Sequence, residues 1–454
     1  MAGNTFSHIP IQVEKIETRY RTIKTQLPVP ESVAMFEKLS GLEAQAMHGQ
    51  IPVVWDRADD FQIYDKWGNV WLDFTSTIFV ANAGHANKRI IKGLQNLLQK
   101  PLLHTYTYLS SERLAYLEYL IENTPAQFEK AFLLSAGTEA TEVSLKLMRM
   151  KGQLDTKTKV GVICFSGAYH GRTMGAQFMN GPSQGRDWIA YNDPNIHHIN
   201  FPYPWLAKDP EAFFEEEIYQ LLEREGLNAD RHLCGFMLET YQGWGAVFYP
   251  KEFVQALERF ARRHQLLIAF DEMQAGFGRT GKLFGYQHYE VEPDILCCGK
   301  GASSGPPLAM VLGSAEIMDL PGIGSMSSTH SANPVACVAG HENLKALLED
   351  GLISNAAELG KVFHRKLNAL KDKYPNHLRY VFGEGLVAAL VFMDQSNRPL
   401  SKLCDRISEL AFQRGLLVVH TGRESIKLAP PLSITEEALL DGIGVIDACI
   451  GDSI

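Results

Sequence analysis

Short apolar runs alternate with longer stretches of helical spacing along most of the chain. Uninterrupted apolar runs predict buried strands at 132–134, 162–165, 235–239, 266–270, 295–298, 307–313 and 386–392. Apolar residues three or four positions apart predict helices over 32–46, 137–150, 211–225, 251–264, 334–349, 353–374 and 402–414. Strands that alternate with helices are typical of α/β proteins built on a parallel sheet.

The N-terminal part of the chain has a different pattern. Residues 1–45 combine mixed charge with a proline-rich turn at 27–32, which predicts an arm followed by a helix. Residues 53–74 predict short strands joined by a turn at Trp67-Gly68-Asn69.

Composition and charge narrow the function classes. The 454 residues suffice for two domains, and 45% hydrophobic with 21% charged residues is ordinary globular composition. A net charge of −9 argues against a general nucleic-acid partner. We found no uncharged apolar run long enough to span a bilayer, so no membrane partner is expected.

Cysteine usage and the first residues bear on location. The seven cysteines are scattered, and Cys297-Cys298 lies inside a predicted strand, which favours reduced thiols over a disulfide framework. The first residues lack the basic start and apolar core of a secretory signal, so a cytoplasmic location is expected. The sequence contains neither CxxC nor HExxH, and no metal site is predicted.

The stretch from Leu266 to Lys300 contains the candidate chemistry. Asp271 follows the apolar run 266–270, and Gly299-Lys300 follows the run 295–298. Open α/β sheets bind ligands at the carboxyl ends of their strands. A lysine there can form a Schiff base with an aldehyde cofactor, and a carboxylate can keep a pyridinium nitrogen protonated. A lone lysine is more often a solvated surface residue, and a lone strand-end aspartate more often caps a helix.

The combined motifs resemble those of the class III pyridoxal-phosphate aminotransferases, the ornithine and 4-aminobutyrate aminotransferase family. The family pattern DEVQ-G-GRTG, then PD, then GK, corresponds to 271–281, 293–294 and 299–300, with Met273 in place of the family's smaller residue, and further matches cover nearly the whole chain. The resemblance implies fold type I, an α/β large domain with a mostly parallel seven-stranded sheet plus a smaller α+β domain. The expected division is an N-terminal arm and part of the small domain at 1–75, the large cofactor domain at 76–345, and the C-terminal small domain at 346–454.

The resemblance also implies a set of residues around pyridoxal 5'-phosphate. Lys300 would bind the aldehyde and move the proton, Asp271 would pair with the pyridine nitrogen, and Gln274 would donate to the phenolic oxygen. The remaining cofactor positions are Met273 and Tyr169 on the two ring faces, Gly137, Thr138 and Thr329 at the phosphate, and Glu239. In the family the threonine at Thr329 reaches the neighbouring subunit, so a homodimer or higher homo-oligomer is expected.

Substrate positions follow the family less closely. The resemblance places Ile78, Phe79, Arg172, Trp244 and Lys427 at substrate positions. Core packing is the alternative for Ile78 and Phe79, and a surface ion pair for Arg172. The family's gate of an acid and an arginine corresponds to Trp244 and Lys427, so both partners have changed. Arg423 or Arg172 could hold a carboxylate in place of Lys427.

These observations predict a transaminase. It would move an amino group between an amine or ω-amino acid donor and a keto acid or aldehyde acceptor. An amino-acid racemase, epimerase, mutase or decarboxylase of the same fold is the alternative, because these enzymes keep the cofactor but not the transfer. A cofactor-binding protein with a decayed site is a third possibility, which the retention of Lys300, Asp271 and Gln274 opposes.

Overall fold

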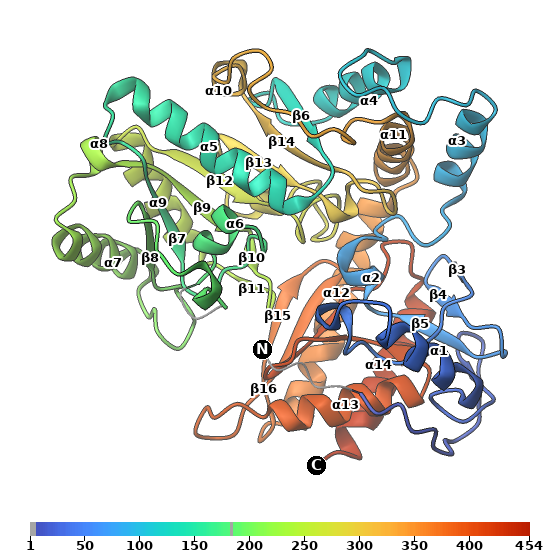
Figure 1. Cartoon of the computed structure of the whole chain (residues 1–454). Coiled ribbons are helices and arrows are strands. Elements are labelled where there is room, and N and C mark those ends of the chain that lie inside the picture. Colours follow the sequence, from blue (N-terminus) through green and yellow to red (C-terminus); the bar gives the residue numbers. More distant parts are fainter. Residues whose placement is uncertain (1–5, 182–184) are drawn as a thin grey trace. The chain divides into compact units, whose positions relative to one another are not determined.

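The protein is described by a computed structural model that covers residues 6–181 and 185–454 (Figure 1). Contacts divide the chain into two compact units. Unit 1 consists of Met1–Asn87, Trp244–Ala246 and Leu352–Ile454, and unit 2 of Lys88–Gly243 and Val247–Gly351. The expected domain boundaries at 75 and 345 stay a prediction.

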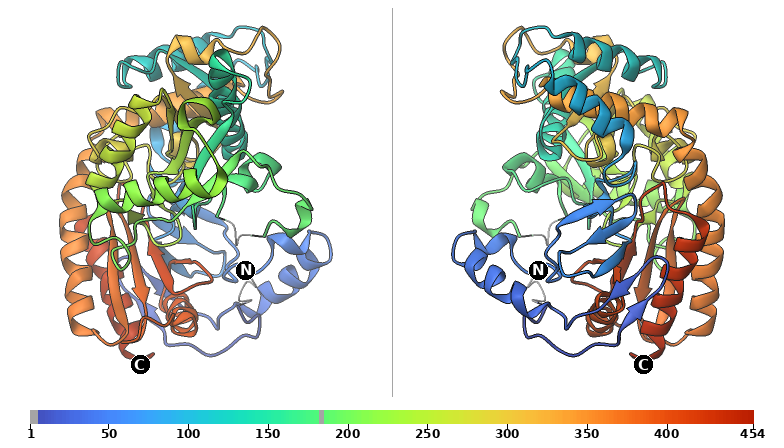
Figure 2. Two further views of the ribbon diagram at one scale, coloured as in Figure 1. Left: turned by 90° about the vertical axis from the view of Figure 1, so that its left-hand side faces the viewer. Right: turned by 90° about the vertical axis from the view of Figure 1, so that its right-hand side faces the viewer.

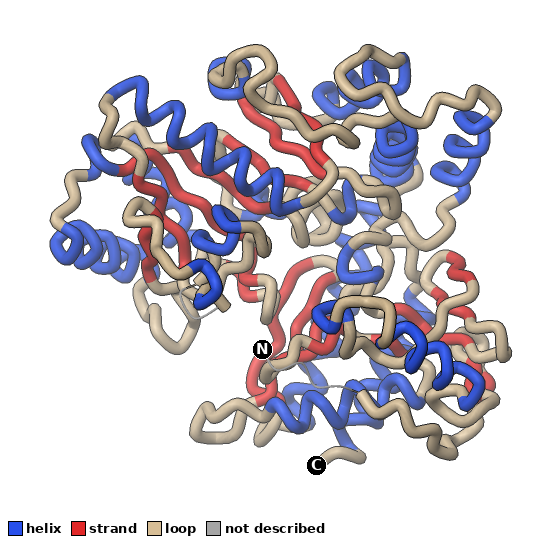
Figure 3. Tube along the Cα trace, in the orientation of Figure 1, coloured by secondary structure: helices blue, strands red, loops and turns tan. Residues whose placement is uncertain are grey.

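Unit 2 is built on a seven-stranded sheet (Figure 3). The strand order is β6 (Lys130–Leu134), β14 (Ala309–Gly313), β13 (Ile295–Cys298), β12 (Leu267–Asp271), β9 (Leu233–Glu239), β7 (Gly161–Phe165) and β8 (Ile196–Ile199). Within this sheet only β14 runs against its neighbours. The expected mostly parallel seven-stranded sheet is therefore confirmed, and the carboxyl ends of the other strands meet at one edge.

The core of unit 2 lies between this sheet and a helix. Helix α5 (Gly137–Asp155) crosses the sheet and buries Leu147 and Met148 against Ala269 and Cys297. Strands covered in this way have apolar residues at successive positions, which is why their sequence pattern lacks alternation. The remaining α-helices of unit 2 are α3 (Lys88–Leu98), α4 (Ser111–Glu122), α6 (Met174–Met179), α7 (Pro210–Glu225), α8 (Ala229–His232), α9 (Lys251–Arg263), α10 (Ala315–Met318) and α11 (Pro334–Glu349).

Shorter elements complete unit 2. Three 3₁₀ turns, η2 (Asp187–Ile189), η3 (Gly285–His288) and η4 (Lys300–Ala302), lie in its loops. The antiparallel strands β10 (Tyr241–Gln242) and β11 (Val247–Phe248) flank residues 244–246.

Unit 1 contains two sheets. The first has the order β1 (Ile16–Glu17), β2 (Thr22–Ile23), β5 (Val70–Asp73), β4 (Gln62–Tyr64) and β3 (Arg57–Asp59), and β17 (Leu416–Leu417) also pairs with β5. The second has the order β15 (Leu378–Glu384), β16 (Val387–Phe392), β19 (Ser425–Leu428) and β18 (Val419–His420). Asp65 accepts the N–H groups of Trp67 and Asn69 at 2.9 Å each, which forms the expected turn between β4 and β5.

Helices cover the sheets of unit 1, and Figure 2 shows the C-terminal ones in orange and red beside their strands. They are α1 (Pro30–Ser40), α2 (Ser76–Phe79), α12 (Leu352–Lys373), α13 (Ser401–Gln413) and α14 (Glu436–Gly451), with the 3₁₀ turn η1 (Gln45–Met47). The expected helix 32–46 was wrong at its end, because the chain leaves the helix after Ser40 at Gly41. Helix α14 was not predicted, although Thr435 accepts the Ala438 N–H at 3.3 Å and caps it.

The cysteines and the helix lengths bear on the expectations of reduced thiols and of no membrane partner. All seven cysteines are buried and free of disulfide bonds. Among residues 6–181 and 185–454, no helix has the length and apolarity needed to cross a membrane.

The packing of α14 generates a stability prediction. A Cβ on Gly442 would lie 2.2 Å from Cζ of the buried Phe74, whereas a Cβ on Gly444 meets nothing within 4 Å. Gly442→Ala should therefore lower the free energy of unfolding by about 1–3 kcal/mol through overpacking. Gly444→Ala is the matched control in the same helix, and it should raise that free energy by up to about 1 kcal/mol. Urea unfolding measures both, and equal effects would contradict the packing argument.

Candidate active site

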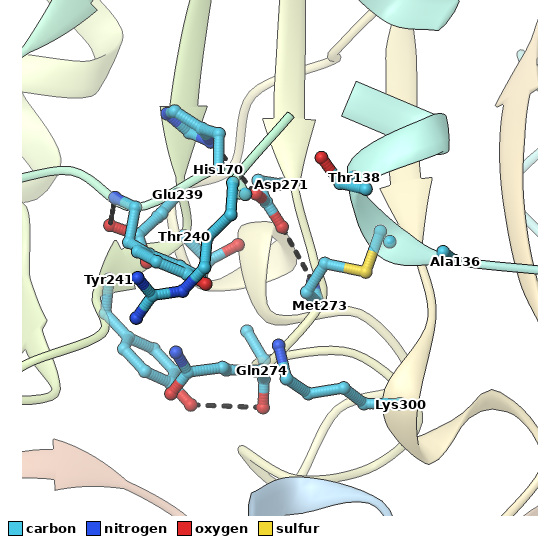
Figure 4. A pocket seen from close by; sticks show the side chains of 15 residues that line it. Ala136, Thr138, His170, Glu239, Thr240, Tyr241, Asp271, Met273, Gln274 and Lys300 are labelled. Carbon is cyan, nitrogen blue, oxygen red and sulfur yellow. Dashed lines mark hydrogen bonds and ion pairs between the residues drawn. The ribbon is translucent and has the colours of Figure 1, made fainter. Parts of the chain in front are cut away.

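A cavity of about 340 Å³ lies in unit 2 where the parallel strands end (Figure 4). Its walls come from the segments that follow β6, β7, β9, β12 and β13. The lining residues are Ala136, Gly137, Thr138, Tyr169, His170, Gly171, Arg172, Glu239, Thr240, Tyr241, Asp271, Met273, Gln274, Ala275 and Lys300. The structure therefore brings together every cofactor position expected from the sequence except Thr329, together with Arg172.

Asp271 is fixed from two sides. It is 4% exposed, and register places it opposite Glu239 on β9 and Cys297 on β13. Its Oδ1 accepts the Met273 N–H at 3.0 Å, and its Oδ2 lies 2.9 Å from Nδ1 of His170. The carboxylate is therefore held rigidly at the cavity (Figure 4).

The sequence analysis missed His170, although it directly follows the predicted Tyr169. The imidazole is buried, and only the fold brings it to a carboxylate 101 residues away. The available signal was its position in the loop after β7, at the sheet edge where Asp271 was expected.

Lys300 opens η4 directly after β13, and its side chain reaches into the cavity (Figure 4). Burial lowers the pKa of its ammonium below the usual value, while the charges of Asp271 and Glu239 oppose this effect. The lowered pKa favours the neutral amine, which is the nucleophilic form. Gly299 is required beside it, because a Cβ there would lie 2.6 Å from the Met273 sulfur.

The first turn of α5 forms the opposite wall. A Cβ on Gly137 would lie 2.8 Å from the Met273 sulfur, so glycine allows this close approach. Helix α5 has 19 residues, and its free N-terminal amides with the Thr138 hydroxyl suit an anion. Thr138 Oγ1 lies 2.6 Å from Thr173 Oγ1, which fixes the position of the hydroxyl.

The Glu239 carboxylate accepts hydrogen bonds from the backbone of two segments at the cavity. Its Oε2 accepts the Tyr169 N–H and its Oε1 accepts the Gly243 N–H, each at 3.1 Å. This carboxylate therefore fixes the loop that carries the Tyr169 ring. The Arg172 guanidinium carbon lies 5.7 Å from the centre of that ring.

The Thr240 side chain binds a buried carboxylate beside the cavity. Its hydroxyl donates to Glu272 Oε1 at 2.5 Å, and the Glu272 carboxylate also accepts the N–H groups of Gly285 and Tyr286 at 2.7 Å each. Burial raises the pKa of Glu272 to about 7, against the lowering effect of these hydrogen bonds. Thr240 and Glu272 thus join the ends of β9 and β12 to η3.

Thr329 lies outside the cavity lining of this chain. It is exposed, and its carbonyl oxygen lies 2.7 Å from Nε2 of His104. Its expected role through a neighbouring subunit stays a prediction.

The other expected substrate residues belong to unit 1. Ile78 is 47% exposed, whereas Phe79 is 1% exposed and packs in the core. The Lys427 Nζ lies 4.7 Å from the centre of the Phe79 ring. The Arg423 guanidinium carbon lies 4.2 Å from the centre of the Trp244 ring, and Arg423 Nη2 donates to Glu424 at 2.9 Å.

The groups around the cavity fit pyridoxal phosphate. The molecule has a ring nitrogen, an aldehyde and a phosphate, and the cavity offers a carboxylate, a buried amine and a helix N-terminus for them. A Cβ on Gly137 or Gly299 would force the Met273 side chain to shift.

Comparisons with known proteins agree with this chemistry. The family described as Aminotransferase class-III matches residues 44–450. The chain is 31% identical to the 4-aminobutyrate aminotransferase GabT of Escherichia coli, over 89% of this chain and 95% of that protein. It is 28% identical to an alanine/serine racemase of Pyrococcus horikoshii, over 99% of this chain and 96% of that protein.

Solved structures give the same assignment. An (S)-enantioselective omega-transaminase from Thermomicrobium roseum superposes with a TM-score of 0.83 at 26% identity, covering 93% of this chain and 99% of that one. The chain therefore belongs to the class III aminotransferase family, and it is a transaminase that depends on pyridoxal phosphate.

Proposed function

We propose that the cavity of unit 2 carries out transamination with Lys300 and Asp271 as its catalytic residues. The observation that supports this most strongly is the shared cavity of a buried amine, a fixed carboxylate and a helix N-terminus. Pyridoxal phosphate, when bound, supplies an aldehyde that condenses with amines and a pyridinium ring that withdraws electrons.

Lys300 would act as nucleophile and then as base. Burial lowers the pKa of its ammonium, which favours the amine form that would bind the cofactor's aldehyde. The released amine would then stand beside the donor's Cα, where it could take up and return the proton that transamination moves.

The other lining residues would hold the ring and its phosphate. Asp271, held by His170 and the Met273 N–H, would accept the pyridinium N–H. Gln274 would donate to the phenolic oxygen, and Met273 and Tyr169 would cover the two ring faces. Gly137, Thr138 and the α5 amides would bind the phosphate.

The substrate assignments are part of this proposal. Arg172 lines the cavity together with Lys300, and its guanidinium would hold one carboxylate of the donor or acceptor. Ile78, Phe79, Trp244 and Lys427 would contact the rest of the donor, with Trp244 favouring an apolar or ring-bearing body. The donor is thus an amine or ω-amino acid, and the acceptor a keto acid or aldehyde.

Racemisation is the second candidate, because the Pyrococcus horikoshii relative is named as an alanine/serine racemase. The two reactions differ in their products and in the form in which they leave the cofactor. Transamination converts the donor into a carbonyl compound and leaves its nitrogen on the cofactor, whereas racemisation changes only optical rotation. A single-turnover screen of amine donors that follows cofactor absorbance and optical rotation separates them.

The Schiff-base lysine is the first prediction of this proposal. Lys300→Ala should lower turnover by more than about 10²-fold, because no second lysine lines the cavity in the described part of the chain. Lys282→Ala is the control, since Lys282 is exposed in the loop between β12 and β13. Borohydride reduction and peptide mapping should find the pyridoxyl group on Lys300, and its recovery on another lysine would refute the assignment.

The second prediction concerns the changed gate. A lysine binds a carboxylate as a point charge, whereas an arginine binds it with two parallel hydrogen bonds. With Lys427 at this position, 2-oxoglutarate should therefore bind more weakly, by roughly 1–3 kcal/mol, than it would with an arginine there. Trp244→Glu combined with Lys427→Arg should raise kcat/KM for 2-oxoglutarate by about tenfold or more. Lys427→Ala alone is the control. Tight use of 2-oxoglutarate by the unmodified protein, unaffected by Lys427→Ala, would end this idea.

The third prediction is a homodimer or a multiple of one, located in the cytoplasm. The exposed Thr329 would contact the phosphate bound by a second copy, and twofold assembly is the commonest arrangement. Thr329→Val should therefore weaken cofactor affinity by about tenfold, as expected for one lost bond to a charged group. Sedimentation and cofactor titration test this together, and an active monomer with unchanged affinity would contradict it.

A further inference from the structure

Helix α2 is a single turn of the left-handed kind. Ser76, Thr77, Ile78 and Phe79 have φ values of +47°, +50°, +60° and +70°. None of these residues is glycine, and Thr77 and Ile78 are β-branched, which makes this conformation costly. Strained backbone of this kind persists only where its surroundings hold it, and it concentrates at functional sites.

A chain of hydrogen bonds holds the start of this turn. Asp73 Oδ1 accepts both the N–H of Thr75 at 2.7 Å and its hydroxyl at 2.6 Å. The Thr75 hydroxyl in turn accepts the Thr77 N–H at 3.0 Å. Asp73 thus acts on the second residue of the turn through Thr75.

His85 completes this chain from the other side. Its Nε2 lies 2.7 Å from Asp73 Oδ2, and the side-chain exposures of His85 and Asp73 are 10% and 0%. A buried carboxylate that loses a donor retains an unpaired, poorly solvated charge. Asp73 therefore needs His85 in order to keep its position beside Thr75.

A second anchor fixes the first residue of the turn, the buried Ser76. The Ser76 hydroxyl donates to the carbonyl of Ala429 at 2.7 Å, and the Ala429 N–H donates to the carbonyl of Phe74 at 2.7 Å. Ala429 directly follows β19, the strand that carries Lys427. The turn and the strand with Lys427 are therefore held in one register.

The handedness of the turn decides which side chains are presented. Ile78 is 47% exposed, while Phe79 is buried beneath the Lys427 ammonium. A right-handed turn would change the directions of both side chains, because side-chain direction follows backbone conformation. The left-handed turn thus sets an apolar surface residue beside a cation that rests on an aromatic ring.

We propose that Asp73 and His85 are positioning residues that hold α2 in its left-handed form and thereby determine which amine donors the enzyme accepts. This inference rests on the proposed function, in which Ile78, Phe79 and Lys427 contact the donor. Asp73 and His85 act on the turn through Thr75, and neither is among the residues that line the cavity of unit 2. Their effect is therefore on donor discrimination and not on cofactor binding.

The test is a double-mutant cycle between His85→Gln and Thr77→Gly. Glycine adopts the left-handed conformation without strain, so Thr77→Gly should raise or preserve the melting temperature. Thr77→Gly should also make the turn independent of the hydrogen-bonded pair Asp73–His85, which we call the clamp. His85→Gln should shift the unfolding equilibrium at least fivefold more in the parent than in the Thr77→Gly background.

Donor kinetics provide the second readout. The probes are ω-amino acids from 3-aminopropanoate to 6-aminohexanoate, which differ only in methylene groups. His85→Gln should change the ratio of kcat/KM between the longest and shortest accepted donors by at least fivefold, mainly through KM. Cofactor affinity should stay within twofold of the parent value.

His420→Gln is the matched control. His420 pairs with Asp405 at 2.6 Å in the same unit and has the same 10% side-chain exposure as His85. It should show no coupling to Thr77. Additive unfolding effects of His85→Gln and Thr77→Gly, or an unchanged donor ratio, would overturn the clamp. Coupling without turnover of any amine would instead overturn the proposed function and its donor assignment while retaining the clamp on the turn.

Discussion

The buried carboxylate of Asp271 constrains the rest of unit 2. It stands at the end of β12, in register with the end of β9, and accepts hydrogen bonds from two different segments. A carboxylate at 4% exposure is stable only with such partners. The loop after β7 must therefore bring His170 to it, and this placement also sets the neighbouring Tyr169 at the cavity. The glycines at 137 and 299 then leave Met273 the space between the two walls.

The strands and the positions of Asp271 and Lys300 could be predicted because their signals are local. Buried parallel strands read as short apolar runs, and a polar residue directly after such a run stands at the sheet edge where ligands bind. The mostly parallel seven-stranded sheet was predicted on the family resemblance and confirmed. His170 could not be predicted, since its partner lies 101 residues away. The hydrogen bond from Thr240 to Glu272 also needs the fold, because two neighbouring strand ends supply its groups.

Unit 1 was harder to predict for a different reason. Several of its strands have only two residues, such as β1, β2, β17 and β18, and these are too short for a periodic pattern. The handedness of α2 was also invisible, because threonine, isoleucine and phenylalanine give no sign of a positive φ. Ile78 and Phe79 were considered as a pair that either packs in the core or contacts substrate. The structure separates them, with Phe79 buried and Ile78 exposed.

Two cations of unit 1, Arg423 and Lys427, each rest on an aromatic ring. Arg423 rests on the Trp244 ring and pairs with Glu424, so its charge is largely balanced. Lys427 rests on Phe79, and its side chain is 6% exposed. An ammonium on an aromatic face retains cation–π stabilisation but offers an anion no parallel pair of donors. In the proposed function, selectivity for the donor would then depend on the shape of the apolar surface that the left-handed turn at Ser76–Phe79 presents.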